Sequence, residues 1–451
     1  MNRPFFSLLA LLFLSTGMAA QLLSPNEFLP HEYGRQFTPH YQLVDYVRHV
    51  ATNSPRVELR QYGLTNEGRP LLLAFISTPE NLARMEDIRQ NNLRYTGLLE
   101  GEPDSTLNRA IAWLSFGVHG NEAGASEASL STLYELAHRS DEEVLSWIGN
   151  TIIILDPCIN PDGFSRYTEW YRRYATKEPS PGGDTYEHDE PWPRGRVNHY
   201  LFDLNRDWAW QTQVETQSRI KEYRKWMPHV HVDFHEQYPG AHYYFAPAAS
   251  PYHKYITDWQ AEAQYEIGKN NASHFDQEGW LYFTREVFDL LYPSYGDTYP
   301  TFNGAIGMTY EQAGHGFAGR AYEMENGDTL TLMDRILHHT TAALSTVEIA
   351  SKNASRLIEN FQNYFDRANN GEAGHYKTFI IRGDNPEGRL RAFREILDKN
   401  GIRYGKAGSS SSLWAYSYQS GKEENILIMP EDLIVSAGQP QSVLAQVLLE
   451  P

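Results

Sequence analysis

Cysteine is almost absent from this chain of 451 residues, which contains only Cys158. A single cysteine allows no disulfide within the chain, so the fold must depend on its core. Cys158 lies in the string DPCINPDG, and we interpret it as a small buried residue rather than a nucleophile. After residue 20 no stretch is long and apolar enough to suggest a membrane-spanning helix.

The chain also lacks an excess of positive charge. It has 39 Lys and Arg against 57 Asp and Glu, and its formal net charge is −18. Nucleic acids and anionic membrane surfaces attract basic proteins and repel acidic ones. We therefore expect no nucleic-acid partner, although acidity alone does not identify a substrate.

Residues 1–20 have the composition of a secretory signal peptide. The string MNRPFFSLLALLFLSTGMAA has one Arg, an apolar centre and small residues at its end, which predicts cleavage after Ala20. A membrane anchor is the weaker alternative, because the apolar run is too short to span a bilayer. The sequence thus predicts a secreted or periplasmic protein with no stable membrane insertion after signal cleavage.

Three short strings have the residue types of one catalytic zinc site. HGNE supplies His119 and Glu122, DFHEQ supplies His235, and MTYEQ supplies Glu311. Three protein ligands with a fourth position left for water are typical of catalytic zinc, and a further carboxylate can act on that water. The helical H-E-x-x-H motif is excluded, since position 239 is Pro.

Each of these strings lies beside a predicted strand. AIAWLSFGV precedes His119, HVHVDF leads into His235, and GAIGMTY leads into Glu311. Such apolar runs are typical of buried strands in a mostly parallel sheet, and active sites of α/β folds lie at strand ends. Gly120 allows a sharp turn, and EAGASEASLSTLYELAHR then predicts a helix. The three groups are expected to converge.

Further motifs lie between these strings. TIIILDPCINPDGFSRY predicts a strand followed by a turn over NPDG, and RGRVNHYLFDLNRDW follows. The motifs H-x-x-E, NPDG, D-x-N-R, D-x-H and T-x-E occur in this order within residues 35–345. In them the chain resembles the zinc carboxypeptidases, the family typified by the pancreatic enzymes, and in particular their secreted bacterial branch.

The resemblance implies a role for several residues. It implies one zinc ion per chain, held by His119, Glu122 and His235, with Asp203 as the carboxylate that orients the first histidine. Asn205 and Arg206 correspond to the pair that binds the substrate's terminal carboxylate, for which a guanidinium fork is well shaped.

The resemblance also implies the catalytic groups. Glu311 corresponds to the general base and acid. Arg196 is our choice for the arginine that polarises the scissile carbonyl, and its rivals are Arg194, Arg172 and Arg173.

The family covers its substrate with a mobile tyrosine. Tyr292, Tyr295 and Tyr299 are all candidates for it here, with a preference for Tyr295. Asp297, in the same segment, is a candidate for facing a basic side chain.

The predicted fold is α/β, with a mixed, mostly parallel central sheet flanked by helices. After the signal peptide, residues 21–350 are expected to form the catalytic domain. Residues 351–451 are expected to form a small C-terminal α/β module, and a module truncated at its end is the alternative. The polar segment 171–200 is rich in Pro, Gly and Asp and is expected to rim the cleft.

The predicted function is that of a secreted zinc metallocarboxypeptidase that hydrolyses the C-terminal peptide bonds of peptides or proteins. Glu311 would act as general base on a zinc-activated water molecule. One alternative is a related zinc amidohydrolase that acts on cell-wall peptides or acyl-amino acids. The other is a non-enzymatic binding protein with a relic site, against which all three ligands and Glu311 argue.

Overall fold

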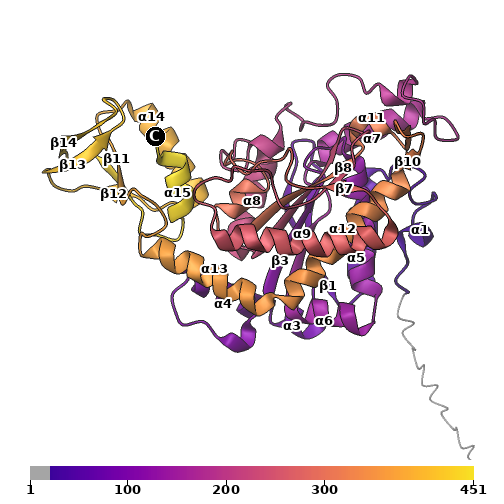
Figure 1. Cartoon of the computed structure of the whole chain (residues 1–451), viewed down its shortest axis with the longest axis horizontal. Helices are drawn as coiled ribbons and strands as arrows, with labels where there is room; N and C mark the ends of the chain where they lie inside the picture. The colour runs from indigo at the N-terminus through magenta and orange to yellow at the C-terminus, as the bar shows by residue number, and fades with distance from the viewer. Residues whose placement is uncertain (1–20) are drawn as a thin grey trace, which may run out of the picture.

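The computed structural model describes residues 21–451, so the predicted signal peptide lies outside the described residues. At its centre is an eight-stranded sheet with the strand order β1-β2-β4-β3-β5-β8-β6-β7 (Figure 1). Its strands are β1 (Val57–Leu64), β2 (Pro70–Ile76), β3 (Ala110–Phe116), β4 (Thr151–Asp156), β5 (Val230–Gln237), β6 (Tyr243–Tyr244), β7 (Tyr282–Phe283) and β8 (Ile306–Ala313). The strand β3 is parallel to β4 and β5, β5 to β8, and β6 to β7, and the other neighbours are antiparallel. This confirms the predicted mixed, mostly parallel sheet.

Helices cover both faces of the sheet. They are α1 (Pro25–Phe28), α2 (His40–Asn53), α3 (Pro79–Ala83), α4 (Met85–Thr96), α5 (Ala123–His138), α6 (Glu142–Asn150), α7 (Pro161–Tyr174), α8 (Val214–Trp226), α9 (Asp258–Glu278), α10 (Thr298–Thr301), α11 (His315–Ala318), α12 (Leu332–Lys352) and α13 (Ala354–Asn369). A small hairpin of β9 (Ala321–Glu323) and β10 (Thr329–Thr331) precedes α12.

The central strand β3 shows why the sheet needs two helical layers. Successive side chains of a strand point to opposite faces. Ala112 and Leu114 join the core that includes α2, α5 and α12, whereas Ile111 and Trp113 join the core that includes α4, α8 and α13. Every residue of β3 is buried, which explains why its run is apolar apart from Ser115.

A smaller module follows α13. It contains a three-stranded sheet of β11 (Thr378–Ile381), β15 (Leu433–Ser436) and β12 (Gly405–Lys406), a hairpin of β13 (Ser411–Ser417) and β14 (Lys422–Ile428), and the helices α14 (Glu387–Asn400) and α15 (Ser442–Leu449). Figure 1 shows this module, in yellow, at one end of the molecule. The helix α13 packs against α4 and β3 and also contacts α15, so it connects the large body to the module. The boundary at residue 350 stays a prediction.

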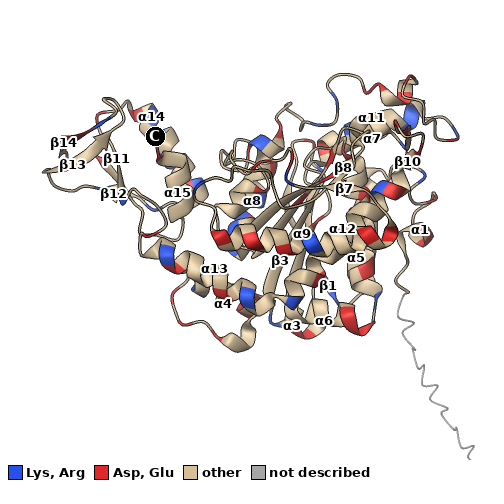
Figure 2. Ribbon diagram, viewed as in Figure 1, with Lys and Arg blue, Asp and Glu red and all other residues tan. Residues whose placement is uncertain are grey.

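Two expectations from composition can be compared with the structure. Cys158 is buried, and burial raises the pKa of its thiol to about 12. The reactive thiolate is therefore scarce near neutral pH, which agrees with the interpretation of Cys158 as a buried residue rather than a nucleophile. Over residues 21–451, no helix combines the length and apolar character that crossing a bilayer requires. Acidic and basic residues are interspersed over the helices (Figure 2).

The expected turn at NPDG was wrong, because this string begins α7. Asn160 is the N-cap of the helix, and its side chain accepts a hydrogen bond of 3.0 Å from the backbone N–H of Gly163. Pro161 occupies the first helical position, where the missing N–H costs nothing. An asparagine cap followed by proline is a signal for a helix start as much as for a turn.

Candidate active site

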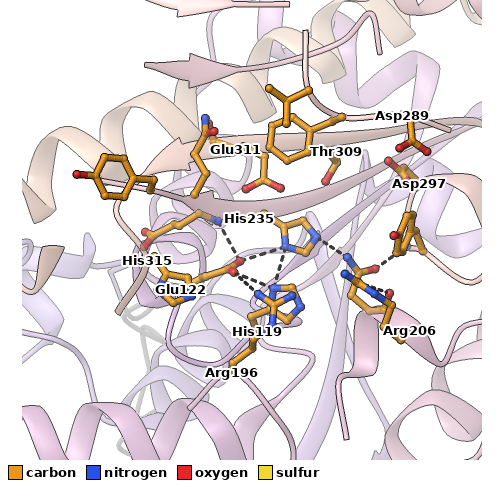
Figure 3. A pocket seen from close by; sticks show the side chains of 18 of the residues that line it. His119, Glu122, Arg196, Arg206, His235, Asp289, Asp297, Thr309, Glu311 and His315 are labelled. Atoms are coloured by element: carbon orange, nitrogen blue, oxygen red, sulfur yellow. Dashed lines mark hydrogen bonds and ion pairs between the residues drawn. The ribbon is translucent and has the colours of Figure 1, made fainter. Parts of the chain in front are cut away.

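The candidate active site lies where β3, β5 and β8 end. His119 follows β3, His235 is near the end of β5, and Glu311 is in β8. His235 and Glu311 are register partners on neighbouring parallel strands, so their side chains share one face of the sheet. All three line one cavity of about 540 Å³ (Figure 3). The structure thus brings together the three strings found in the sequence.

Three glycines hold the loop of His119 against its neighbours. A Cβ on Gly120 would lie 2.0 Å from the backbone nitrogen of Phe164, and one on Gly163 would lie 2.2 Å from the carbonyl oxygen of Gly195. Gly120 lies in the expected turn, which the hydrogen bond of 3.1 Å from the backbone N–H of Glu122 to the carbonyl oxygen of His119 closes, and it also allows close backbone approach. This packing also places Arg196, the next residue after Gly195, beside the site.

We expect a Gly163→Ala substitution to lower the free energy of unfolding by about 1–3 kcal/mol, because the new methyl group overpacks a rigid backbone contact. Denaturant unfolding measures this. Gly149→Ala is the matched control, since a Cβ on Gly149 in α6 meets nothing within 4 Å. Equal stability of the two variants would contradict the close-packing argument.

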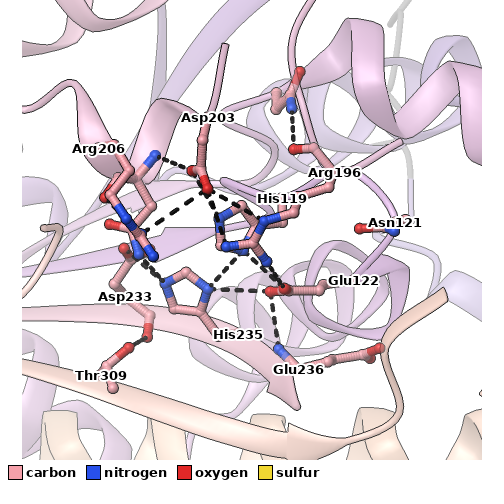
Figure 4. A network of polar contacts seen from close by, with 12 residues as sticks. His119, Asn121, Glu122, Arg196, Asp203, Arg206, Asp233, His235, Glu236 and Thr309 are labelled. Carbon is pink, nitrogen blue, oxygen red and sulfur yellow. Dashed lines mark hydrogen bonds and ion pairs between the residues drawn. The ribbon is translucent and has the colours of Figure 1, made fainter. Parts of the chain in front are cut away.

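Three side chains converge as a possible metal site. Nδ1 of His119 lies 2.7 Å from Oε1 of Glu122. Nδ1 of His235 lies 3.1 Å from Oε2 of Glu122 and 3.2 Å from Nδ1 of His119. The three side chains are buried and offer ligand atoms within 4.8 Å of one another. Their Nδ1 atoms face inward, toward the carboxylate (Figure 4).

Carboxylates also lie at the outer edges of both imidazoles. Nε2 of His119 lies 3.0 Å from Oδ1 of Asp203. Nε2 of His235 lies 3.0 Å from Oδ2 of Asp233, in a direction that is poor for a hydrogen bond but close enough for strong attraction. A carboxylate beside Nε2 favours the tautomer with a proton there, and we assign that tautomer to both rings.

This assignment makes the inner cluster a good fit for a divalent cation. With Nε2 protonated, both Nδ1 atoms present lone pairs, and they face each other and the carboxylate of Glu122. Three acceptors this close repel one another unless a cation lies among them. Two imidazole nitrogens and one carboxylate are donors that zinc prefers, and three protein ligands leave its fourth position for water.

A second group of possible ligands fits a metal less well. Glu67, Asp162 and His199 also lie close together, but Glu67 and His199 are exposed. Arg69 already makes ion pairs of 2.5 and 2.8 Å with Glu67 and Asp162. Its guanidinium supplies the positive charge that a cation would supply.

Glu311 faces the metal cluster from β8. Its side chain lines the cavity but lies outside the group of possible ligands. Burial raises the pKa of Glu311 to about 8, and a cation nearby would lower it again. A carboxylate with a pKa near neutrality is suited to exchanging protons with water.

Of the four arginines considered for the carbonyl, Arg196 alone lines the cavity. Its guanidinium lies 3.0 Å from Oδ2 of Asp203 and 3.5 Å from Oε1 of Glu122. Arg194 lies over the ring of Phe317 instead. Arg172 and Arg173 are exposed on α7. The segment 171–200, which was expected to rim the cleft, therefore contributes Arg196 to the cavity wall.

Asn205 and Arg206 line the other side of the cavity. The guanidinium of Arg206 lies over the ring of Tyr295, 4.5 Å from its centroid, and is 46% exposed. It does not pair with Asp207, whose carboxylate accepts bonds from Thr212 and from the backbone of Gln213. Nη1 of Arg206 donates to the carbonyl oxygen of Asn205 at 3.1 Å and lies 3.9 Å from Oδ2 of Asp203, and the side chain lines the cavity.

The three tyrosines differ in their environments. Tyr295 lines the cavity. Tyr292 accepts a hydrogen bond of 2.8 Å from Trp210, and Tyr299 is fully buried. Asp297 lies in the cavity wall, where burial and the nearby Asp233 raise its pKa to about 7.

Sequence reasoning missed two features of this site. Asp233 was read as part of a D-x-H motif without a role, although its position two residues before His235 places both on one face of β5. His315, at the start of α11, lines the cavity with a strained φ of +59° and a ring stacked on Phe317. Its flanking glycines, in AGHGF, were the available signal.

Comparisons with known proteins agree with these motifs. A family profile described as zinc carboxypeptidase matches residues 43–278, just over half of the chain. A search of curated proteins gave no match.

Similar solved structures include a metallo-carboxypeptidase from Burkholderia cenocepacia, with 15% identity, a TM-score of 0.49 and coverage of 69% of each chain. Another is a metallo-carboxypeptidase from Pseudomonas aeruginosa, with 15% identity, a TM-score of 0.46, and coverage of 72% of this chain and 70% of the other. The carboxypeptidase A of Helicoverpa armigera has 16% identity, a TM-score of 0.45, and coverage of 73% and 75%.

The matched residues 43–278 include His119, Glu122 and His235, the buried cluster whose donors suit zinc. They also include the segment of Asp203, Asn205 and Arg206. The chain therefore belongs to the zinc carboxypeptidase family and is a zinc metallopeptidase.

Proposed function

We propose that this chain is a secreted carboxypeptidase that removes residues from the free C-termini of peptides or proteins. The convergence of the His119, Glu122 and His235 cluster with Glu311 and Arg206 in one cavity is the observation that carries the proposal. Secretion rests on the signal-like composition of residues 1–20.

The metal would be held by His119, Glu122 and His235, with Asp203 and Asp233 fixing the two imidazoles. One zinc ion per chain would supply Lewis-acid chemistry, activating water and polarising the scissile carbonyl. The roles proposed for the protein's own groups then follow from their positions around the cavity.

Glu311 is proposed to take a proton from the attacking water and return it to the leaving amine. Its place beside His235 on the neighbouring strand supports this role. Arg196 is proposed to stabilise the negative charge that develops on the carbonyl oxygen. Its guanidinium, beside Asp203 and Glu122, is oriented before substrate arrives.

Arg206 and Asn205 are proposed to select a free terminal carboxylate. The exposed fork of Arg206 can donate two parallel hydrogen bonds to such a group. Tyr295, beneath the guanidinium, restricts its orientation.

We expect peptides with a free C-terminus to be hydrolysed faster than their C-terminal amides, and Arg206→Ala to abolish the difference. A hydrogen bond to a charged group contributes about 1.5–3 kcal/mol, or roughly tenfold or more in kcat/KM. Arg194→Ala is the matched control, because Arg194 lies over Phe317 without lining the cavity.

The assay compares kcat/KM for each peptide pair, with and without a chelator. Equal cleavage of both forms by the parent protein would reject an exopeptidase and would favour an amidohydrolase. Activity that survives the chelator would reject the zinc mechanism.

A further inference from the structure

The last turn of α14, in the C-terminal module, docks against the large body. Asn400 is fully buried there and makes four hydrogen bonds. Its Nδ2 donates to the carbonyl oxygens of Ile396 and Ala209, both at 2.9 Å. Its Oδ1 accepts from Tyr299 at 2.9 Å and from Gln211 at 3.2 Å. Three of these bonds reach the large body.

Two of the segments that bond to Asn400 lie next to the part of the cavity formed by Arg206 and Tyr295, which we call the carboxylate-binding corner. Ala209 and Gln211 follow Arg206 by a few residues, and Tyr299 is in α10, directly after the cavity residue Asp297. Asn400 therefore joins the two chain segments that carry Arg206 and Tyr295.

A short relay continues from Asn400 to Arg206. The backbone N–H of Ala209 donates to Oγ of Ser294 at 2.9 Å. The hydroxyl of Ser294 donates to the carbonyl oxygen of Arg206 at 3.0 Å. Ala209 and Ser294 are fully buried, so the bond between them is shielded from water, and the bond from Ser294 to Arg206 is partly buried.

Further contacts hold the same turn in place. Arg224 of α8 donates to the carbonyl oxygens of Asp398 and Lys399 at 3.4 and 3.1 Å, which satisfies the end of the helix. Lys399 donates to the carbonyl oxygen of Gln211 at 3.0 Å. The turn is thus bound to the segment after Arg206 by more than one side chain.

We propose that Asn400 is a positioning residue for Arg206, so that the C-terminal module completes the site that binds the substrate's terminal carboxylate. This inference rests on the proposed function of Arg206. Recognition by a guanidinium fork depends strongly on direction, and small displacements of a binding group cost much of its effect. Asn400 fixes the backbone from which the fork projects.

Asn400→Ala tests this directly. It leaves the carbonyl of Ala209 and the hydroxyl of Tyr299 without partners, and the corner must relax to satisfy them. We expect KM for a peptide with a free C-terminus to rise about tenfold, the scale of one misplaced hydrogen-bonding group. The kcat value, kcat/KM for the amidated peptide, and zinc content should stay near those of the parent.

Gln439→Ala is the matched control. Gln439 is also buried in the C-terminal module, where it bonds with the backbone of Arg403 and Ser436 and makes no bond to the cavity segments. It should lower stability while leaving the preference for free C-termini unchanged. If Gln439→Ala lost the preference as Asn400→Ala does, the effect would be general to the module and the inference would fail.

Two further variants keep the inference testable if Asn400→Ala does not fold. Asn400→Asp keeps the shape and the acceptor for Tyr299 but places a carboxylate oxygen against the carbonyl of Ala209. Ser294→Ala breaks the relay without touching α14. Both should raise KM for the free peptide alone, and an unchanged KM in folded protein would overturn the inference. A parent protein without preference for free C-termini would instead reject the proposed function.

Discussion

We expect a His235→Ala variant to purify with almost no zinc, whereas the parent carries about one zinc ion per chain. His235 is one of the three proposed zinc donors, and its Nδ1 lies 3.1–3.2 Å from the other two side chains. Loss of even an outer partner of a zinc ligand lowers metal affinity about 10–100-fold, so loss of a donor should cost more. Metal analysis of the purified variant, together with peptide hydrolysis, measures this.

The control for this experiment is a histidine that shares the cavity without belonging to the cluster. His315 lines the cavity, and burial lowers its pKa to about 4, so it is neutral near pH 7. His315→Ala should retain zinc. Full zinc occupancy in His235→Ala would refute the proposed ligand set, and loss of zinc from both variants would show that the cavity does not tolerate truncation at either position.

The zinc affinity of the Asp203→Asn and Asp233→Asn variants should lie between that of His235→Ala and that of His315→Ala. Each keeps the shape of a side chain that lies 3.0 Å from Nε2 of a histidine, but removes its charge. We expect zinc affinity to fall about 10–100-fold, which is typical for the loss of a residue that hydrogen-bonds to a metal ligand.

The strands that carry the site could be predicted from the sequence because they are buried on both faces. The run before His119 is apolar apart from Ser115, the run before His235 alternates His with Val, and the structure has the buried strands β3 and β5 there. The order of the sheet could not be predicted, since β3 lies between β4 and β5 only through long crossover connections. The two-residue strands β6 and β7 are too short to leave a periodic signal.

Site residues that lie within one short motif could be predicted from the sequence. Where several residues of the same type were candidates, only the tertiary structure shows which of them reaches the cavity. The spacing in HGNE leads to His119 and Glu122, which the structure brings together at 2.7 Å. Four arginines were candidates for polarising the carbonyl, and the packing of Gly195 against Gly163, a contact that the sequence does not show, helps to bring Arg196 to the cavity. The position of Asn400 could not be predicted from the sequence, because its hydrogen bond to Ala209 joins residues 191 positions apart.

We expect Glu311→Gln to keep its zinc and to lose about 10²–10⁴-fold in kcat/KM, the usual contribution of a general acid–base group. The amide has the shape of the carboxylate and cannot take a proton from water. Burial raises the pKa of Glu311 to about 8, and the next largest contributions come from the charges of His235 and Glu122. Because Glu311 lines the cavity, its carboxyl group can meet solvent or substrate there.

Kinetics on a peptide with a free C-terminus, with zinc content measured in parallel, tests the role of Glu311. Glu127→Gln is the matched control, because Glu127 is also a fully buried carboxylate, with a pKa raised to about 7 by burial. It lies in α5, where its carboxylate accepts hydrogen bonds from Thr38, outside the cavity. The Glu127→Gln variant should have the same kcat/KM as the parent, since neutralising a buried carboxylate outside the cavity should not by itself inhibit the enzyme.

Near-parental turnover by Glu311→Gln with full zinc would mean that another group moves the proton. A variant that lost zinc as well would show instead that Glu311 belongs to the metal site, because its carboxylate shares one face of the sheet with His235.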